Sequence, residues 1–159
     1  AIAGLLHDVI EDCGAHHEPR IRADFGDNVA RIVLACTDGT AEEKAGHADA
    51  EARRLDWVRR KQAYLAHLAE ADDEVLLVSG CDKLHNARAL VQDLEDPLVG
   101  DRVFDRFTAQ RDGTLWYYAQ LRELFSRRGV RTAALMGAAV DRMHAAGGSE
   151  KVAGTAPRT

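Results

Sequence analysis

A His-Asp pair and an acidic pair lie one helical turn apart near the start of the chain. His7-Asp8 is followed by Glu11-Asp12, in a stretch whose apolar residues recur at helical spacing. The pattern predicts one continuous helix, with His7 stacked over Glu11 and Asp8 over Asp12. Three clustered carboxylates repel one another, so a purely structural surface with these residues would cost stability. An imidazole beside carboxylates suits a divalent metal with a general acid or base next to it.

A second polar group interrupts an apolar helical segment at residues 81–86, which read Cys-Asp-Lys-Leu-His-Asn. Apolar neighbours predict that Asp82 is buried, and a buried carboxylate needs a partner such as a cation. We therefore predict a metal site formed by His7, Asp8 and Asp82. Imidazole and carboxylate donors suit Mn²⁺, Fe²⁺ or Zn²⁺ better than Ca²⁺.

A divalent ion at this site would lower the pKa of a bound water, and Glu11 or Asp12 would orient that water or move its proton. Other interpretations of the same residues stay open. A lone His-Asp pair is often a surface pair or a helix cap, and Asp82-Lys83 also fits an ordinary surface ion pair. The remaining histidines, His85 among them, fit solvated positions.

Composition limits the function classes. The chain has 159 residues, of which 46% are hydrophobic, enough for one globular domain with a core. The formal net charge of −5 argues against general nucleic-acid binding. No segment approaches the roughly 18 apolar residues of a membrane span. Three cysteines without C-x-x-C spacing predict reduced, mostly buried thiols of a cytoplasmic protein.

Helical periodicity predicts an all-α domain of about seven to eight helices over residues 1–146, with a disordered tail at 147–159 and a mobile loop at 40–50. The expected helices are one ending near Cys13, then 18–25, one starting at Asn28, 50–69, 74–93, 101–126 with a possible break near Gly113, and 130–146. The aromatic run 116–118 is expected in the core, with an interaction interface as the alternative.

Several motifs in order along the chain carry a family resemblance. They are His7-Asp8 with Glu11-Asp12, Phe25-Gly26, Thr37-Asp38, Arg60-Lys61 with Tyr64, and Asp82-Lys83-Leu84-His85-Asn86. The set resembles the HD-domain hydrolases of the RelA/SpoT type, and most closely the small single-domain alarmone hydrolases. The resemblance covers residues 1 to about 125.

The resemblance implies a helical HD-domain bundle that binds one Mn²⁺. It also implies removal of the 3′-pyrophosphate from (p)ppGpp, which yields GDP or GTP and pyrophosphate. His7 and Asp8 resemble the family's second and third metal ligands, and Asp82 the fourth. Glu11 and Asp12 resemble the pair that activates water and handles protons.

The resemblance also suggests how the nucleotide is held. Asn86 resembles a residue that contacts the sugar or base region. Lys61 and Arg111 are candidate phosphate contacts, from their charge and approximate position, because a phosphate-rich substrate needs cations. A solvated helix surface is the competing interpretation for both. The expected partner is a small nucleotide, with no nucleic acid and no membrane.

Two departures from the family pattern matter. The family's first metal-ligating histidine lies on a helix upstream of His7-Asp8, so we expect the true N-terminus and its helix to be missing from this sequence. If these residues were the whole molecule, we would expect weak metal binding and little turnover. The family often carries a threonine three residues after the asparagine, where this chain has Ala89.

These departures keep two other functions open. The first is an HD phosphohydrolase that acts on another nucleotide, a nucleoside phosphate or NADPH. The second is a non-catalytic, nucleotide-binding regulatory module. The sequence leaves the oligomeric state and the identity of the metal open.

Overall fold

Helices make up most of the described chain. The computed structural model describes residues 1–39 and 49–147, and 83% of these are helical, with no strand among them. The α-helices are α1 Ile2–Leu6, α2 Val9–Cys13, α3 Glu18–Phe25, α4 Asp27–Cys36, α6 Ala50–Glu70, α7 Asp73–Glu95, α8 Gln110–Arg127 and α9 Ala133–Ala146. Two 3₁₀ helices, η1 at Ala15–His17 and η2 at Gly100–Arg106, join them. The all-α prediction of about seven to eight helices is confirmed.

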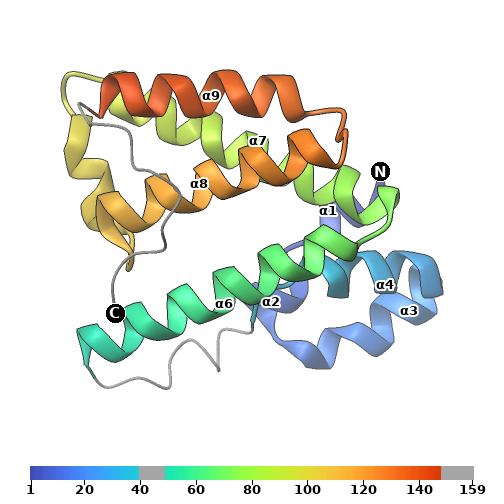
Figure 1. Cartoon of the computed structure of the whole chain (residues 1–159). Helices are drawn as coiled ribbons and strands as arrows, with labels where there is room; N and C mark the ends of the chain where they lie inside the picture. The colour runs from blue at the N-terminus through green and yellow to red at the C-terminus, as the bar shows by residue number, and fades with distance from the viewer. Residues whose placement is uncertain (40–48, 148–159) are drawn as a thin grey trace.

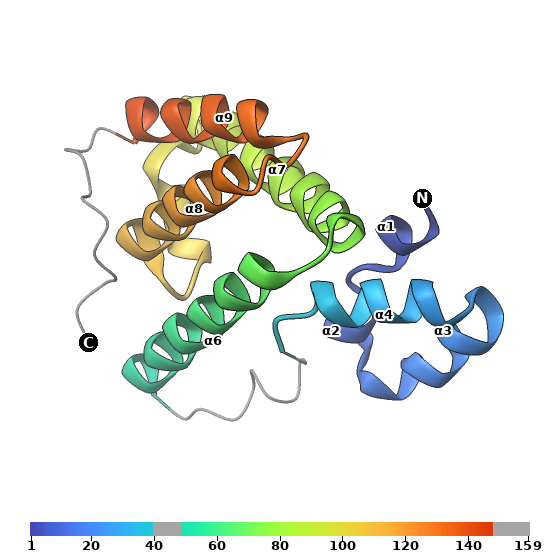
Figure 2. The ribbon, with the colours of Figure 1, turned by 45° about the vertical axis from the view of Figure 1, so that its right-hand side comes forward.

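The helices form two groups that meet at α7 (Figures 1 and 2). The C-terminal group consists of α7, α8 and α9, which pack on one another, with α6 against α8. The N-terminal group consists of α1 to α4, and α1 contacts both α4 and α7. The start of the chain therefore lies beside α7, although the two are far apart in the sequence (Figure 2).

Helix α7 forms because its first turn is capped and one face is continuously apolar. The Asp72 carboxylate accepts hydrogen bonds from the backbone N–H groups of Glu74 and Val75, both at 3.0 Å. The buried residues of this helix are Val75, Leu76, Ser79, Gly80, Leu84, Ala87, Leu90, Val91 and Leu94. Contacts with α4 and α9 hold the backbone on both sides. The 74–93 prediction is confirmed, and α7 presents Asp82 from a fixed position.

Aromatic side chains join α6 to α8. The Trp57 ring meets Trp116 edge-on at 6.3 Å and Tyr117 at 6.0 Å between ring centroids. Trp116, Tyr117 and Tyr118 are all buried, which confirms the expected core position of this run. Beyond α8, the Arg128 guanidinium donates to the carbonyl oxygen of Ala71 at 2.8 Å, at the end of α6. These contacts fix α6 relative to α8.

The predicted single N-terminal helix is wrong, because it breaks into α1 and α2 at His7 and Asp8. In an unbroken helix His7 would stack over Glu11, and the consecutive side chains of His7 and Asp8 would point in different directions. The break lets His7 and Asp8 turn toward the same point on α7. The tertiary arrangement therefore overrides an apolar spacing that continues through the turn.

The predicted helix over 101–126 is also wrong in its first part. Residues Gly100–Arg106 form η2, and α8 begins only at Gln110. Buried Val103 and Phe104 place η2 in the core, in contact with α7 and α8. The break therefore precedes Gly113, which lies inside α8 where an added Cβ would come within 2.5 Å of the Ala109 side chain.

Other expectations have mixed outcomes. The described cysteines are free, but only Cys36 is buried, so the prediction of mostly buried thiols is wrong. The last helix begins at Ala133 rather than 130. None of the described helices is long and apolar enough to cross a membrane. The predicted loop at 40–50 and tail at 147–159 fall, except for residues 49, 50 and 147, outside the described residues.

Candidate metal centre

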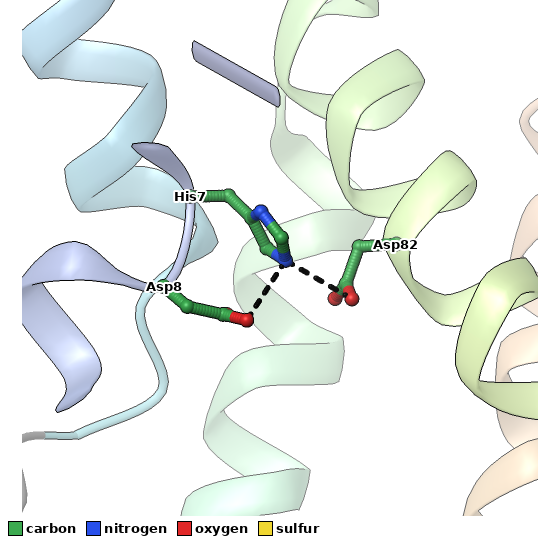
Figure 3. A group of neighbouring side chains, drawn as sticks. All are labelled: His7, Asp8 and Asp82. Carbon is green, nitrogen blue, oxygen red and sulfur yellow. Dashed lines mark ion pairs between the residues drawn. The ribbon is translucent and has the colours of Figure 1, made fainter. Parts of the chain in front are cut away.

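Three predicted metal ligands converge between the N-terminal helices and α7. His7 and Asp8 come from the break between α1 and α2, and Asp82 from the middle of α7 (Figure 3). The His7 Nε2 atom lies 3.1 Å from Asp8 Oδ2 and 3.2 Å from Asp82 Oδ1. One donor atom from each residue lies within 4.8 Å of the other two, the only such group in the described part of the chain. The arrangement fits three ligands of one small cation.

The hydrogen bonding of His7 determines which ring nitrogen faces the carboxylates. Its Nδ1 atom lies 2.9 Å from the Gly4 carbonyl oxygen, so Nδ1 carries the proton and donates it there. In the neutral ring the Nε2 atom then carries the lone pair, and among the described residues it is buried without a directed hydrogen bond. A lone pair that faces two carboxylate oxygens is repulsive unless a proton on Nε2 or a metal cation lies between them. A histidine oriented by a backbone carbonyl is the usual arrangement of a metal ligand.

Both oxygens of Asp82 have partners on α7. Lys83 Nζ lies 2.6 Å from Oδ2, and the Asn86 amide donates to Oδ1 at 2.9 Å. The Asp82 side chain is only 9% exposed. Burial opposes the charged form of Lys83, but the nearby Tyr117 and Tyr64 side chains, together with the Asp82 carboxylate, keep the pKa of Lys83 above its ordinary value. The alternative of a surface ion pair for Asp82-Lys83 is therefore wrong.

The pKa of Asp8 reflects the charged side chains around it. Partial burial raises the pKa of Asp8, and the nearby charges of Asp82 and Glu11 raise it further, whereas His7 lowers it. Glu11 therefore lies close enough to Asp8 to act on the same site. Asp12 is exposed on α2, and its backbone N–H donates to the Asp8 carbonyl oxygen at 2.8 Å. The catalytic roles of Glu11 and Asp12 stay predictions.

Lys61 lies in the interior near this cluster. Its ammonium forms an ion pair with the almost fully buried Asp38 and lies 4.9 Å from the centroid of the Tyr117 ring. Burial lowers the pKa of Lys61, whereas the charges of Asp38 and Glu11 raise it. The solvated-surface interpretation of Lys61 is therefore wrong, and a phosphate-binding role stays a prediction. No role was predicted for Asp38, although Thr37-Asp38 is among the motifs that carry the resemblance.

Arg111 is not brought into the cluster. It lines a separate cavity of about 380 Å³ at the start of α8, together with Arg54 and Phe104. Its guanidinium lies at the end of α9, where Nη2 is 3.7 Å from the position that a Cβ atom would occupy on Gly147. This placement gives no support to Arg111 as a phosphate contact at the metal site.

A cavity of about 420 Å³ opens beside the metal ligands. His7 and Asp82 form part of its wall, and the rest includes Leu77, Val78 and His85. His85 therefore lies next to the site. The nearby Cys36 thiol is not one of the three ligands, and burial raises its pKa to about 12, so it stays protonated at neutral pH.

Sequence comparison agrees with this geometry. Residues 1–115, most of the chain, match the HD domain family. No curated protein matches the sequence. HD domains bind divalent metals and are generally metal-dependent phosphohydrolases, which is the chemistry that one imidazole and two carboxylates around a shared point can support. From its sequence match over residues 1–115, this chain belongs to the HD domain family.

Proposed function

We propose that the chain hydrolyses (p)ppGpp to GDP or GTP and pyrophosphate, with Mn²⁺ as its metal. The observation that carries the phosphohydrolase assignment is the buried His7 Nε2 atom that faces Asp8 and Asp82. The choice of substrate rests on the ordered motifs that resemble the RelA/SpoT-type hydrolases. Asn86, at the position of the family's nucleotide contact, lies one turn beyond Asp82 on the same helix.

In this proposal His7, Asp8 and Asp82 hold the ion. The bound ion supplies Lewis-acid stabilisation of phosphate charge and lowers the pKa of a water ligand. Glu11, whose charge acts on Asp8, orients the attacking water, and the exposed Asp12 carries its proton toward solvent. Lys61 contributes a positive charge on the interior side, where it complements the phosphates.

Another nucleotide is the second candidate substrate. Ala89 stands where the family often has a threonine, and it is exposed on α7 one turn beyond Asn86. A methyl group there cannot donate the hydrogen bond that a hydroxyl would give to a sugar. The same metal site would then act on a nucleoside phosphate or NADPH.

The test is to incubate the protein with Mn²⁺ and ppGpp and to measure pyrophosphate release. Asp82→Ala, which removes one ligand, should abolish the release. Asp93→Ala is the matched control, because Asp93 lies on the same helix but forms an ion pair with Arg106, away from the proposed metal site. A panel of nucleotides, read separately for phosphate and pyrophosphate, identifies the substrate. Metal-loaded protein that binds nucleotides but hydrolyses none of them would replace the proposal with a regulatory binding module.

A further inference from the structure

Lys83 is the buried cation closest to the metal ligands. Its side chain is 14% exposed, and Nζ lies 2.6 Å from Asp82 Oδ2 and 5.5 Å from the centroid of the Tyr64 ring. The Tyr64 hydroxyl is in turn hydrogen-bonded to the fully buried Ser79 hydroxyl at 2.9 Å. Residues of α6 and α7 thus fix the place of the ammonium group.

The two oxygens of Asp82 face different surroundings. Oδ1 lies 3.2 Å from His7 Nε2, on the side of the other ligands, and also accepts the Asn86 amide hydrogen bond. Oδ2 is occupied by Lys83. Building on the proposed metal site, we infer that Lys83 is a positioning residue that holds Asp82 so that Oδ1 alone binds the metal.

This arrangement has a chemical consequence. A carboxylate that binds through one oxygen uses one coordination position, whereas a bidentate carboxylate uses two. With one donor atom each from His7, Asp8 and Asp82, positions remain for water and for substrate oxygens, as an open catalytic site requires. Lys83 acts through Asp82 rather than on the substrate, because its ammonium already lies between the carboxylate and the Tyr64 ring.

The test measures Mn²⁺ affinity directly, by the electron paramagnetic resonance signal of the free ion. Lys83→Met keeps the length of the side chain but removes its charge and its hydrogen-bond donors. Loss of a group that orients a metal ligand typically weakens metal affinity about 10–100-fold, and we expect that range here. Lys83→Arg, which keeps the charge and the donors, should recover most of the lost affinity.

Arg106→Met is the matched control. Like Lys83, Arg106 pairs with a carboxylate of α7, at 2.9 Å, but that carboxylate belongs to Asp93, which is not a proposed metal ligand. Its removal should leave Mn²⁺ affinity close to that of the wild type. Circular dichroism melts without metal show whether each variant is folded, and Lys83→Gln replaces Lys83→Met if the latter is not.

The outcomes separate the inference from the proposed function. Equal or tighter Mn²⁺ binding by Lys83→Met, or equal loss in Lys83→Met and Lys83→Arg, would overturn the positioning role and leave the metal site intact. A wild-type protein that binds no Mn²⁺ would remove the metal site and the positioning role together. Weaker binding confined to Lys83→Met and recovered by Lys83→Arg would support the inference.

Discussion

Asp82→Asn should remove most of the stabilisation that Mn²⁺ gives to the folded protein. The substitution keeps the shape of the side chain but replaces a negatively charged ligand oxygen by a neutral amide. Of the three proposed ligands, Asp82 is the one supplied by α7, so its loss should detach the N-terminal helices from α7 at the metal. Loss of a group that only orients a metal ligand weakens metal affinity by up to roughly 100-fold. Because Asp82 is a proposed ligand itself, we expect Asp82→Asn to lower Mn²⁺ affinity by at least this factor.

The magnitude follows from binding linkage. Mn²⁺ at about 100 times its wild-type Kd adds about 2.7 kcal/mol to the free energy of unfolding. After a roughly 100-fold loss of affinity, the same concentration adds only about 0.4 kcal/mol. For a chain of this size each kcal/mol shifts the melting temperature by about 2–4 °C. The wild-type shift should therefore be about 5–10 °C and the variant shift about 1–2 °C.

The assay compares the melting temperature of each protein with Mn²⁺ and with a chelator. Each protein serves as its own reference, because the amide also loses the ion pair with Lys83 and lowers the metal-free stability. Asp93→Asn, the same change elsewhere on α7, should keep the full wild-type shift. An equal Mn²⁺ shift in wild type and Asp82→Asn would refute the assignment of Asp82 as a ligand.

Two further predictions concern the helices that position the site. Asp72→Ala removes the cap of α7 and should cost about 1 kcal/mol of unfolding free energy in urea titrations. The backbone hydrogen bond from Val75 is the main cause that lowers the pKa of Asp72. The cap therefore contributes fully to stability above the ordinary pKa of an aspartate, and its contribution is lost as the pH falls through the lowered pKa. An Asp72→Ala variant whose stability falls with acid as the wild type's does would contradict this. Tyr64→Phe keeps the ring beneath Lys83 but leaves the buried Ser79 hydroxyl without its partner, which should cost about 1–3 kcal/mol with Mn²⁺ affinity unchanged; a loss of Mn²⁺ affinity would show that the hydroxyl, and not only the ring, supports the site.

Local signals were sufficient for the long helices. The sequence predicted 50–69 and 74–93, and the structure has α6 at Ala50–Glu70 and α7 at Asp73–Glu95. Each has an aspartate at its N-cap whose side chain accepts backbone hydrogen bonds, and capping acts within a few residues. An apolar face repeated over several turns made the helix type clear.

Short breaks were not predictable in the same way. The apolar spacing continues through His7-Asp8 and through residues 107–109, so periodicity reads each as unbroken helix. The breaks are decided by distant contacts: His7 and Asp8 turn toward Asp82, and η2 buries Val103 and Phe104 against α7 and α8. Such contacts leave no local trace in the spacing of apolar residues.

The sequence by itself determined which residue types could hold a metal, since imidazole and carboxylate chemistry depends on the side chain alone. It also determined the helices that carry them, because capping and amphipathicity are local. Only the tertiary structure decided that Lys83 and Lys61 are interior cations, that Arg111 lies in another cavity, and which nitrogen of His7 faces Asp8 and Asp82. Burial and hydrogen-bond direction depend on neighbours from other helices, and those neighbours are set by packing rather than by sequence distance.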